Sequence, residues 1–97
     1  MVIVEARVVA KSGKRDAFIK AAQPSIAATR KEKGCMLYEL YASTENADAL
    51  LYFEKWSDRA ALDSHMKSAH MAEFAVVKKE QDLADGDAEV MIFDIVG

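Results

Sequence analysis

The sequence predicts an α+β fold of the ferredoxin-like type, in which the order β-α-β-β-α-β gives a four-stranded antiparallel sheet with helices on one face. Segments rich in valine, isoleucine and aromatic residues alternate along the chain with segments whose apolar residues recur every three or four positions. The 97 residues have the size of one domain, so we expect residues 1–97 to form a single domain.

A short turn separates the first strand from the first helix. Residues 2–10 are rich in valine and isoleucine and predict a strand. Ser12 is a candidate N-cap for a helix over about residues 14–33. Pro24 lies inside this helix and is expected to kink or split it, because proline lacks the backbone N–H, and Gly34 ends it. One face of the helix carries Phe18, Ala22 and Ile26.

The second half of the chain predicts a hairpin, two helical pieces and a last strand. Residues 36–42 and 49–56 are expected to be strands joined by a polar turn. Ser57 and Asp58 open a short helix, and Ser68 is expected to cap another. The inward positions on these two helices are Ala61, Leu62, His65 and Met66, then Met71, Phe74 and Ala75. Residues 90–96 form the fourth strand.

The strands carry apolar side chains on both faces, although the helices can cover only one. In the last strand Val90, Ile92 and Val96 share one face, and Met91, Phe93 and Ile95 share the other. An uncovered apolar face is typical of an interface, so we expect a homodimer with two sheets face to face in a dimeric α/β barrel. The sequence leaves open which face meets the partner. It also leaves open whether the strand acids Glu5, Glu39 and Glu54 form ion pairs across that interface or point to solvent.

The charge balance and the apolar runs exclude several classes of function. Thirteen basic and sixteen acidic residues give a net charge of −3, which disfavours binding to nucleic acid. Apolar runs fall far short of the ~20 residues that cross a membrane, and charges interrupt the N-terminal apolar stretch, so we expect a cytoplasmic protein. Cys35 is the only cysteine and cannot form an internal disulfide, and we expect it to serve as inert packing.

Four side chains are candidates for a small-molecule pocket. His65 lies on the inward face of its helix, and Trp56, Tyr38 and Phe74 are large side chains from the neighbouring segments. His65 and His70 are five residues apart, about 140° on an ideal helix, so they do not form the usual helical metal pair and we expect no metal site. Nothing resembles a glycine-rich phosphate loop, so we expect no nucleotide cofactor.

Residues 52–70, YFEKWSDRAALDSHMKSAH, resemble the signature of the antibiotic biosynthesis monooxygenase domain family. That signature joins an aromatic-Glu-x-Trp strand end to a helix with Ala-Leu-x-x-His and a second histidine. Glu32-Lys33-Gly34-Cys35 and Tyr38-Glu39-Leu40 are similar to the family's first helix end and second strand, and the resemblance spans nearly the whole chain.

The resemblance implies a dimeric α+β barrel and a cofactor-independent oxygenase that acts on a quinol, an anthrone or a polyphenol with dioxygen. In this role His65 takes the substrate proton, because imidazole titrates near neutral pH, Trp56 and Phe74 hold the aromatic ring, and Tyr38 bonds a substrate oxygen. The alternative is a non-catalytic dimeric module that binds a small hydrophobe, supports another protein or takes part in a stress response. It predicts a filled core with His65 bonded to the backbone.

Two other branches of the family match this chain less well. The haem-degrading branch uses an asparagine on the first strand and an axial histidine on the last helix, and this chain has Glu5-Ala6-Arg7 on the first strand and no histidine after His70. A branch that isomerises phosphorylated sugars needs a polar anionic site. The candidate pocket residues here are mostly apolar, which favours an aromatic substrate.

Overall fold

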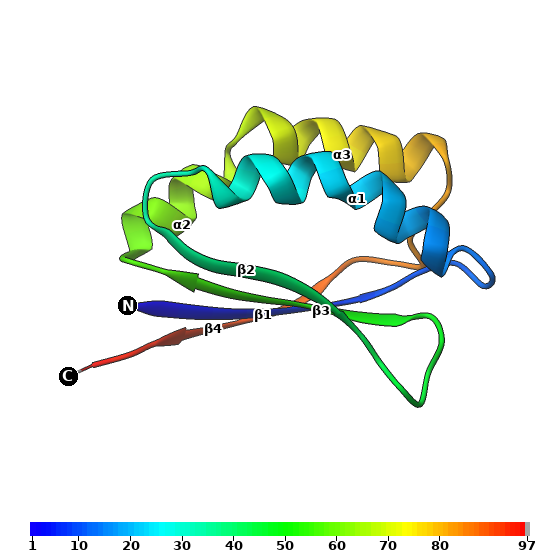
Figure 1. The fold of residues 1–97 in the computed structure, drawn as a ribbon, viewed down its shortest axis with the longest axis horizontal. Coiled ribbons are helices and arrows are strands. Elements are labelled where there is room, and N and C mark those ends of the chain that lie inside the picture. Colours follow the sequence, from blue (N-terminus) through cyan, green and yellow to red (C-terminus); the bar gives the residue numbers. More distant parts are fainter. Residues whose placement is uncertain (97) are drawn as a thin grey trace.

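The computed structural model describes residues 1–96 and confirms the predicted order of strands and helices. Within these residues the four strands form one antiparallel sheet in the order β2-β3-β1-β4, and the second helical segment is divided in two. Figure 1 shows α1, α2 and α3 together on one side of the sheet. The elements are β1 (Val2–Val9), α1 (Arg15–Arg30), β2 (Cys35–Ala42), β3 (Ala49–Trp56), α2 (Arg59–Met66), α3 (Ala69–Glu80) and β4 (Glu89–Asp94).

Helix α1 differs from the expectation at two positions. It runs without a break from Arg15 to Arg30, so the predicted division at Pro24 is wrong. Pro24 lies on the exposed side of the helix, where water can bond the carbonyl that lacks its amide partner. Lys14 rather than Ser12 occupies the N-cap position, because Gly13 makes a turn with φ +77° before the helix begins.

The two helices of the second half begin where the sequence predicts. The side chain of Asp58 caps α2 by accepting a hydrogen bond from the amide of Ala61, and Ser68 occupies the N-cap position of α3. Their inward faces are narrower than expected. Leu62, His65 and Phe74 are buried, whereas Met66 is 58% exposed and Ala75 is also exposed.

Strand β3 shows which face of the sheet the helices cover. Its residues alternate, with Leu50, Tyr52, Glu54 and Trp56 buried beneath the helices and the residues between them on the open face. The pairing register places Phe93 beside Ile3 and Met91 beside Glu5, so these two β4 residues lie on the open face. Glu54 is therefore in the core under the helices, and neither expectation for it, an ion pair across the dimer interface or exposure to solvent, describes this position. Glu39 lies at the surface and forms an ion pair with Arg30.

Gly34 fixes how the connection between α1 and β2 meets α2. Its φ of +87° is a conformation that favours glycine, and a Cβ there would lie 2.5 Å from the Cβ of Ala61 and 2.7 Å from Oγ of Ser57. The carbonyl of Gly34 also accepts a hydrogen bond of 2.8 Å from the amide of Ser57. This close approach brings Glu32, two residues earlier, against the segment that carries His65. Across residues 1–96 no helix has the length and apolar character needed to cross a membrane.

Candidate active site

A cavity of about 330 Å³ lies between the sheet and the α2–α3 segment. This volume is in the range of small-molecule sites. Val90 and Ile92 of the edge strand β4 line it and remain 47% and 43% exposed, so the cavity opens along that strand. Its other apolar wall residues are Val4, Ala6, Val8, Leu62, Met66, Met71, Phe74 and Ala88.

Four polar side chains converge on this apolar wall. Tyr38, Tyr52, Glu54 and His65 all line the cavity, and each is at most 7% exposed. Burial, with the charge of Glu54 as the next cause, raises the pKa of both tyrosines far above the ordinary value. The two phenols therefore stay neutral at any physiological pH and can donate hydrogen bonds to an oxygen in the cavity.

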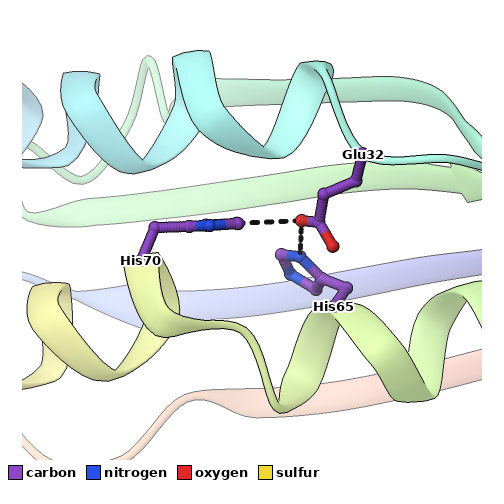
Figure 2. A group of neighbouring side chains, drawn as sticks. All are labelled: Glu32, His65 and His70. Atoms are coloured by element: carbon purple, nitrogen blue, oxygen red, sulfur yellow. Dashed lines mark hydrogen bonds and ion pairs between the residues drawn. The ribbon is translucent and has the colours of Figure 1, made fainter.

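His65 is held on three sides. Its ring lies between Tyr38, edge-on at 5.4 Å between ring centroids, and Trp56, at 4.7 Å, and only 1% of the residue is exposed. Its Nδ1 lies 2.7 Å from Oε2 of Glu32, and Figure 2 shows the ring directed at that carboxylate. The carboxylate accepts, so Nδ1 donates to it, and in a neutral imidazole Nε2 is then the acceptor nitrogen of a residue that lines the cavity.

The second histidine reaches the same carboxylate oxygen. Nε2 of His70 lies 2.9 Å from Oε2 of Glu32, and the two imidazole rings are 6.1 Å apart (Figure 2). The 140° separation expected for one continuous helix does not apply, because α2 ends at Met66 and α3 begins at Ala69. The two histidines meet across the break between α2 and α3, not as a pair on one helical face. Glu32, His65 and His70 offer three ligand atoms within 4.8 Å of one another, a set that can hold a metal ion.

The predicted ring-holding residues occupy different positions. Phe74 lines the cavity and makes an edge-on contact with Phe18 at 5.6 Å. Trp56 is fully buried and lies behind His65, and among residues 1–96 it is not part of the cavity wall. Its indole N–H donates a hydrogen bond of 2.9 Å to Oε1 of Glu54. The structure thus brings His65, Tyr38 and Phe74 to the cavity and places Trp56 against the ring of His65, outside the described cavity wall.

Glu54 is a site residue that the sequence reasoning missed. Burial raises the pKa of this carboxyl above its ordinary value, and Glu32 adds to the effect, while the Trp56 hydrogen bond and His65 oppose it. The position was available from the sequence, because Glu54 lies between Tyr52 and Trp56 on the alternating pattern of one strand face. Glu32 belongs to the family-like segment Glu32-Lys33-Gly34-Cys35, but no pattern in the sequence places it beside His65, which is 33 residues away.

Two basic side chains line the cavity, and the free cysteine lies outside its described wall. Lys78 lines the cavity with its Nζ 4.8 Å from the Phe74 ring centroid, and burial lowers the pKa of this lysine, with Asp87 opposing the shift. Arg59 also lines the cavity and pairs with Asp94 at 3.3 Å. The free Cys35 is half-buried, and burial followed by the charge of Glu32 raises the pKa of its thiol, which reduces its reactivity.

An apolar cavity between an antiparallel sheet and its helices, with a buried histidine in its wall, is typical of small-molecule sites. The chain belongs to the antibiotic biosynthesis monooxygenase family, whose sequence profile matches residues 1–76. "Uncharacterized protein sll1783" of Synechocystis is 35% identical over 94 residues, which are 97% of this chain, and the chain spans only 63% of that relative's length. "Putative monooxygenase YcnE" of Bacillus subtilis is 31% identical over 80 residues, covering 82% of this chain and 84% of the relative.

Solved structures of relatives show the same fold. A conserved protein from Methanosarcina mazei superimposes with a TM-score of 0.86 at 32% identity, over 95% of this chain and 89% of the other. The ferredoxin-like arrangement predicted from the element order is therefore confirmed.

Proposed function

We propose that this chain is a cofactor-independent monooxygenase that oxidises a quinol-, anthrone- or polyphenol-like aromatic with dioxygen. The observation that carries the proposal is the pairing of His65 with Glu32 at the wall of an apolar cavity. A carboxylate at Nδ1 fixes the tautomer that leaves Nε2 free to take a proton, as in other histidine bases. Glu32 acts through His65 and is a positioning residue.

The reaction needs only a base, an enclosed site and dioxygen. His65 removes a proton from the activated C–H or O–H of the substrate, and the resulting anion gives two electrons to dioxygen as a new C–O bond forms. The carbon-bound peroxide then breaks its O–O bond and loses water, leaving a C=O group. One oxygen atom enters the product and the other leaves as water with two substrate hydrogens, one of them returned by His65.

The cavity supplies the environment that such an anion requires. The neutral phenols of Tyr38 and Tyr52 can donate hydrogen bonds to the developing oxyanion. The apolar wall, with Phe74 at the face opposite the sheet, suits a flat aromatic ring and limits the access of water.

We also propose that the functional unit is a homodimer formed through the open face of the sheet. Met91 and Phe93 are 45% and 41% exposed there, and the register places Leu51 and Phe53 on the same face. Exposed apolar residues in neighbouring rows form a patch of the kind that a second copy covers.

The non-catalytic alternative predicts a filled core and a His65 ring bonded to the backbone. A cavity of about 330 Å³ and a ring bonded to a carboxylate side chain both favour the catalytic function instead.

The test is oxygen consumption by the purified protein against a panel of reduced quinols and anthrones, before and after treatment with a chelator. We expect turnover that survives chelation. His65→Ala should lower it by ~10²- to 10⁴-fold, the usual range for a positioned general base. His70→Ala should lower it much less, because among the described residues His70 contacts Glu32 rather than the cavity. Unchanged turnover in a folded His65→Ala variant would remove the catalytic role of His65.

A further inference from the structure

The proposed reaction uses Glu32 and His65, yet His70 is bound to the same carboxylate oxygen. We propose that Glu32, His65 and His70 form a binding site for a first-row divalent cation of the Zn²⁺ type, and that a bound cation switches His65 off as a base. The first half stands on the geometry alone, and the second half rests on the proposed function.

The three ligand atoms are arranged nearly as a tetrahedral site needs them. Nδ1 of His65 and Nε2 of His70 lie 2.7 and 2.9 Å from Oε2 of Glu32, and all three atoms lie within 4.8 Å of one another. In a zinc site with bonds of about 2.0–2.1 Å, ligand atoms are separated by about 3.4 Å. Side-chain shifts of about 1 Å or less therefore suffice to place a cation between them, with a fourth position left for water.

The donor set and its access both suit such a cation. Two imidazoles and one carboxylate are ligands that Zn²⁺ and its first-row neighbours accept, and that Ca²⁺ and Mg²⁺ do not prefer. His65 is fixed by the rings of Tyr38 and Trp56, which reduces the cost of ordering it. The side chains of Glu32 and His70 are 16% and 21% exposed, so a cation can enter from solvent without passing through the cavity.

Occupation of the site has a direct consequence for His65. A neutral imidazole carries one N–H, and in the metal-free protein it lies on Nδ1 and is donated to Glu32. A cation bound at Nδ1 needs the lone pair of that nitrogen, so the proton moves to Nε2. Nε2 then donates instead of accepting and cannot take a proton from the substrate. The charge on His65 and the number of protons that it holds are unchanged.

The proposed cation site is tested on chelator-treated, desalted protein by calorimetry with Zn²⁺ and by visible absorption with Co²⁺. We expect one cation per chain and the d–d bands of a four- or five-coordinate Co²⁺. Glu32→Gln and His70→Gln each remove a ligand atom, so each should weaken binding by at least the roughly 10- to 100-fold that loss of a side chain hydrogen-bonded to a metal ligand costs. Cys35→Ser and Asp63→Asn, a thiol and an acid that lie outside the cluster, should leave the affinity unchanged.

Two results would overturn the site. One is affinity retained in both ligand variants, and the other is a sulfur-to-cobalt charge-transfer band that Cys35→Ser removes. A measurement on the unaltered protein guards against variants that fail to fold. The chain has only two histidines, so Zn²⁺ must shift the NMR signals of both imidazole rings, and a spectrum in which fewer than two rings move contradicts the proposal.

The switch is tested by following turnover as Zn²⁺ is added. We expect turnover to fall in proportion to the occupancy that calorimetry measures. Full occupancy by Zn²⁺ with unchanged turnover would overturn the proposed switch but not the proposed cation site. A metal-free protein without turnover on any substrate would instead overturn the proposed function, while the calorimetry and NMR still decide the metal site.

Discussion

The indole N–H of Trp56 donates a hydrogen bond of 2.9 Å to the carboxyl of Glu54, two positions away on the same buried face of β3. This contact satisfies one oxygen of an acid that is only 5% exposed. It lowers the pKa of Glu54, but burial has the larger effect, so the pKa is raised overall.

The raised pKa predicts how stability depends on pH. The folded state holds the Glu54 proton more tightly than the unfolded chain does, so its contribution to stability is complete below the ordinary carboxyl pKa and is lost as pH rises through the raised value. Because glutamine does not ionise, Glu54→Gln should gain stability relative to the unaltered protein as pH rises above about 4, the ordinary carboxyl pKa. Urea unfolding at a series of pH values measures the difference. The exposed Glu73→Gln is the control, and a difference for Glu54→Gln that stays constant with pH would contradict the argument.

Glu32 offers a test of positioning as distinct from binding. Glu32→Gln should lower kcat by roughly 10²- to 10⁴-fold, because the amide no longer enforces the tautomer of His65. KM should change little, since among residues 1–96 Glu32 is not part of the cavity wall. Steady-state kinetics on an active substrate separate the two constants, with Glu73→Gln as the control. A rise in KM at constant kcat would show that Glu32 acts on substrate binding instead.

Gly34 links the stability of the fold to the site. Gly34→Ala should destabilise the protein by more than about 1 kcal/mol, because alanine at a φ of +87° is strained and its Cβ would overlap Ala61 and Ser57. The shift should also move Glu32 away from His65 and lower kcat. Gly13→Ala is the matched control, since Gly13 has a similar φ of +77° with open space around it. Equal losses in the two variants, measured by urea unfolding, would mean that the backbone angle alone is responsible.

The dimer is tested by a charge on the open face. Light scattering of the unaltered protein at micromolar concentration should give about twice the chain mass, and Phe93→Glu should give the mass of one chain or an unfolded protein. Val76→Glu is the control, because Val76 is 54% exposed on α3, on the other side of the sheet. A folded protein that is monomeric before any substitution would refute the interface.

The sequence predicts more of the fold than of the candidate site. The alternation of Leu50, Tyr52 and Trp56 and the spacing of Phe18, Ala22 and Ile26 are local patterns, and they place the strands and α1 within about three residues. The register with β1 was needed to show that Phe93 and Met91 share the open face. Glu32 meets the histidines only through the approach of Gly34 to Ala61, a contact between distant segments that no local pattern contains.

Trp56 is the only tryptophan of the chain, and its ring lies against that of His65. The intrinsic fluorescence of the protein on excitation of the indole therefore originates beside the proposed base. A bound aromatic, a cation at Nδ1 or a rotated imidazole would each alter the emission by contact quenching or by a change in local polarity. The molecule thus carries an optical reporter of its own site, and ligands can be screened with unlabelled protein before any turnover is known.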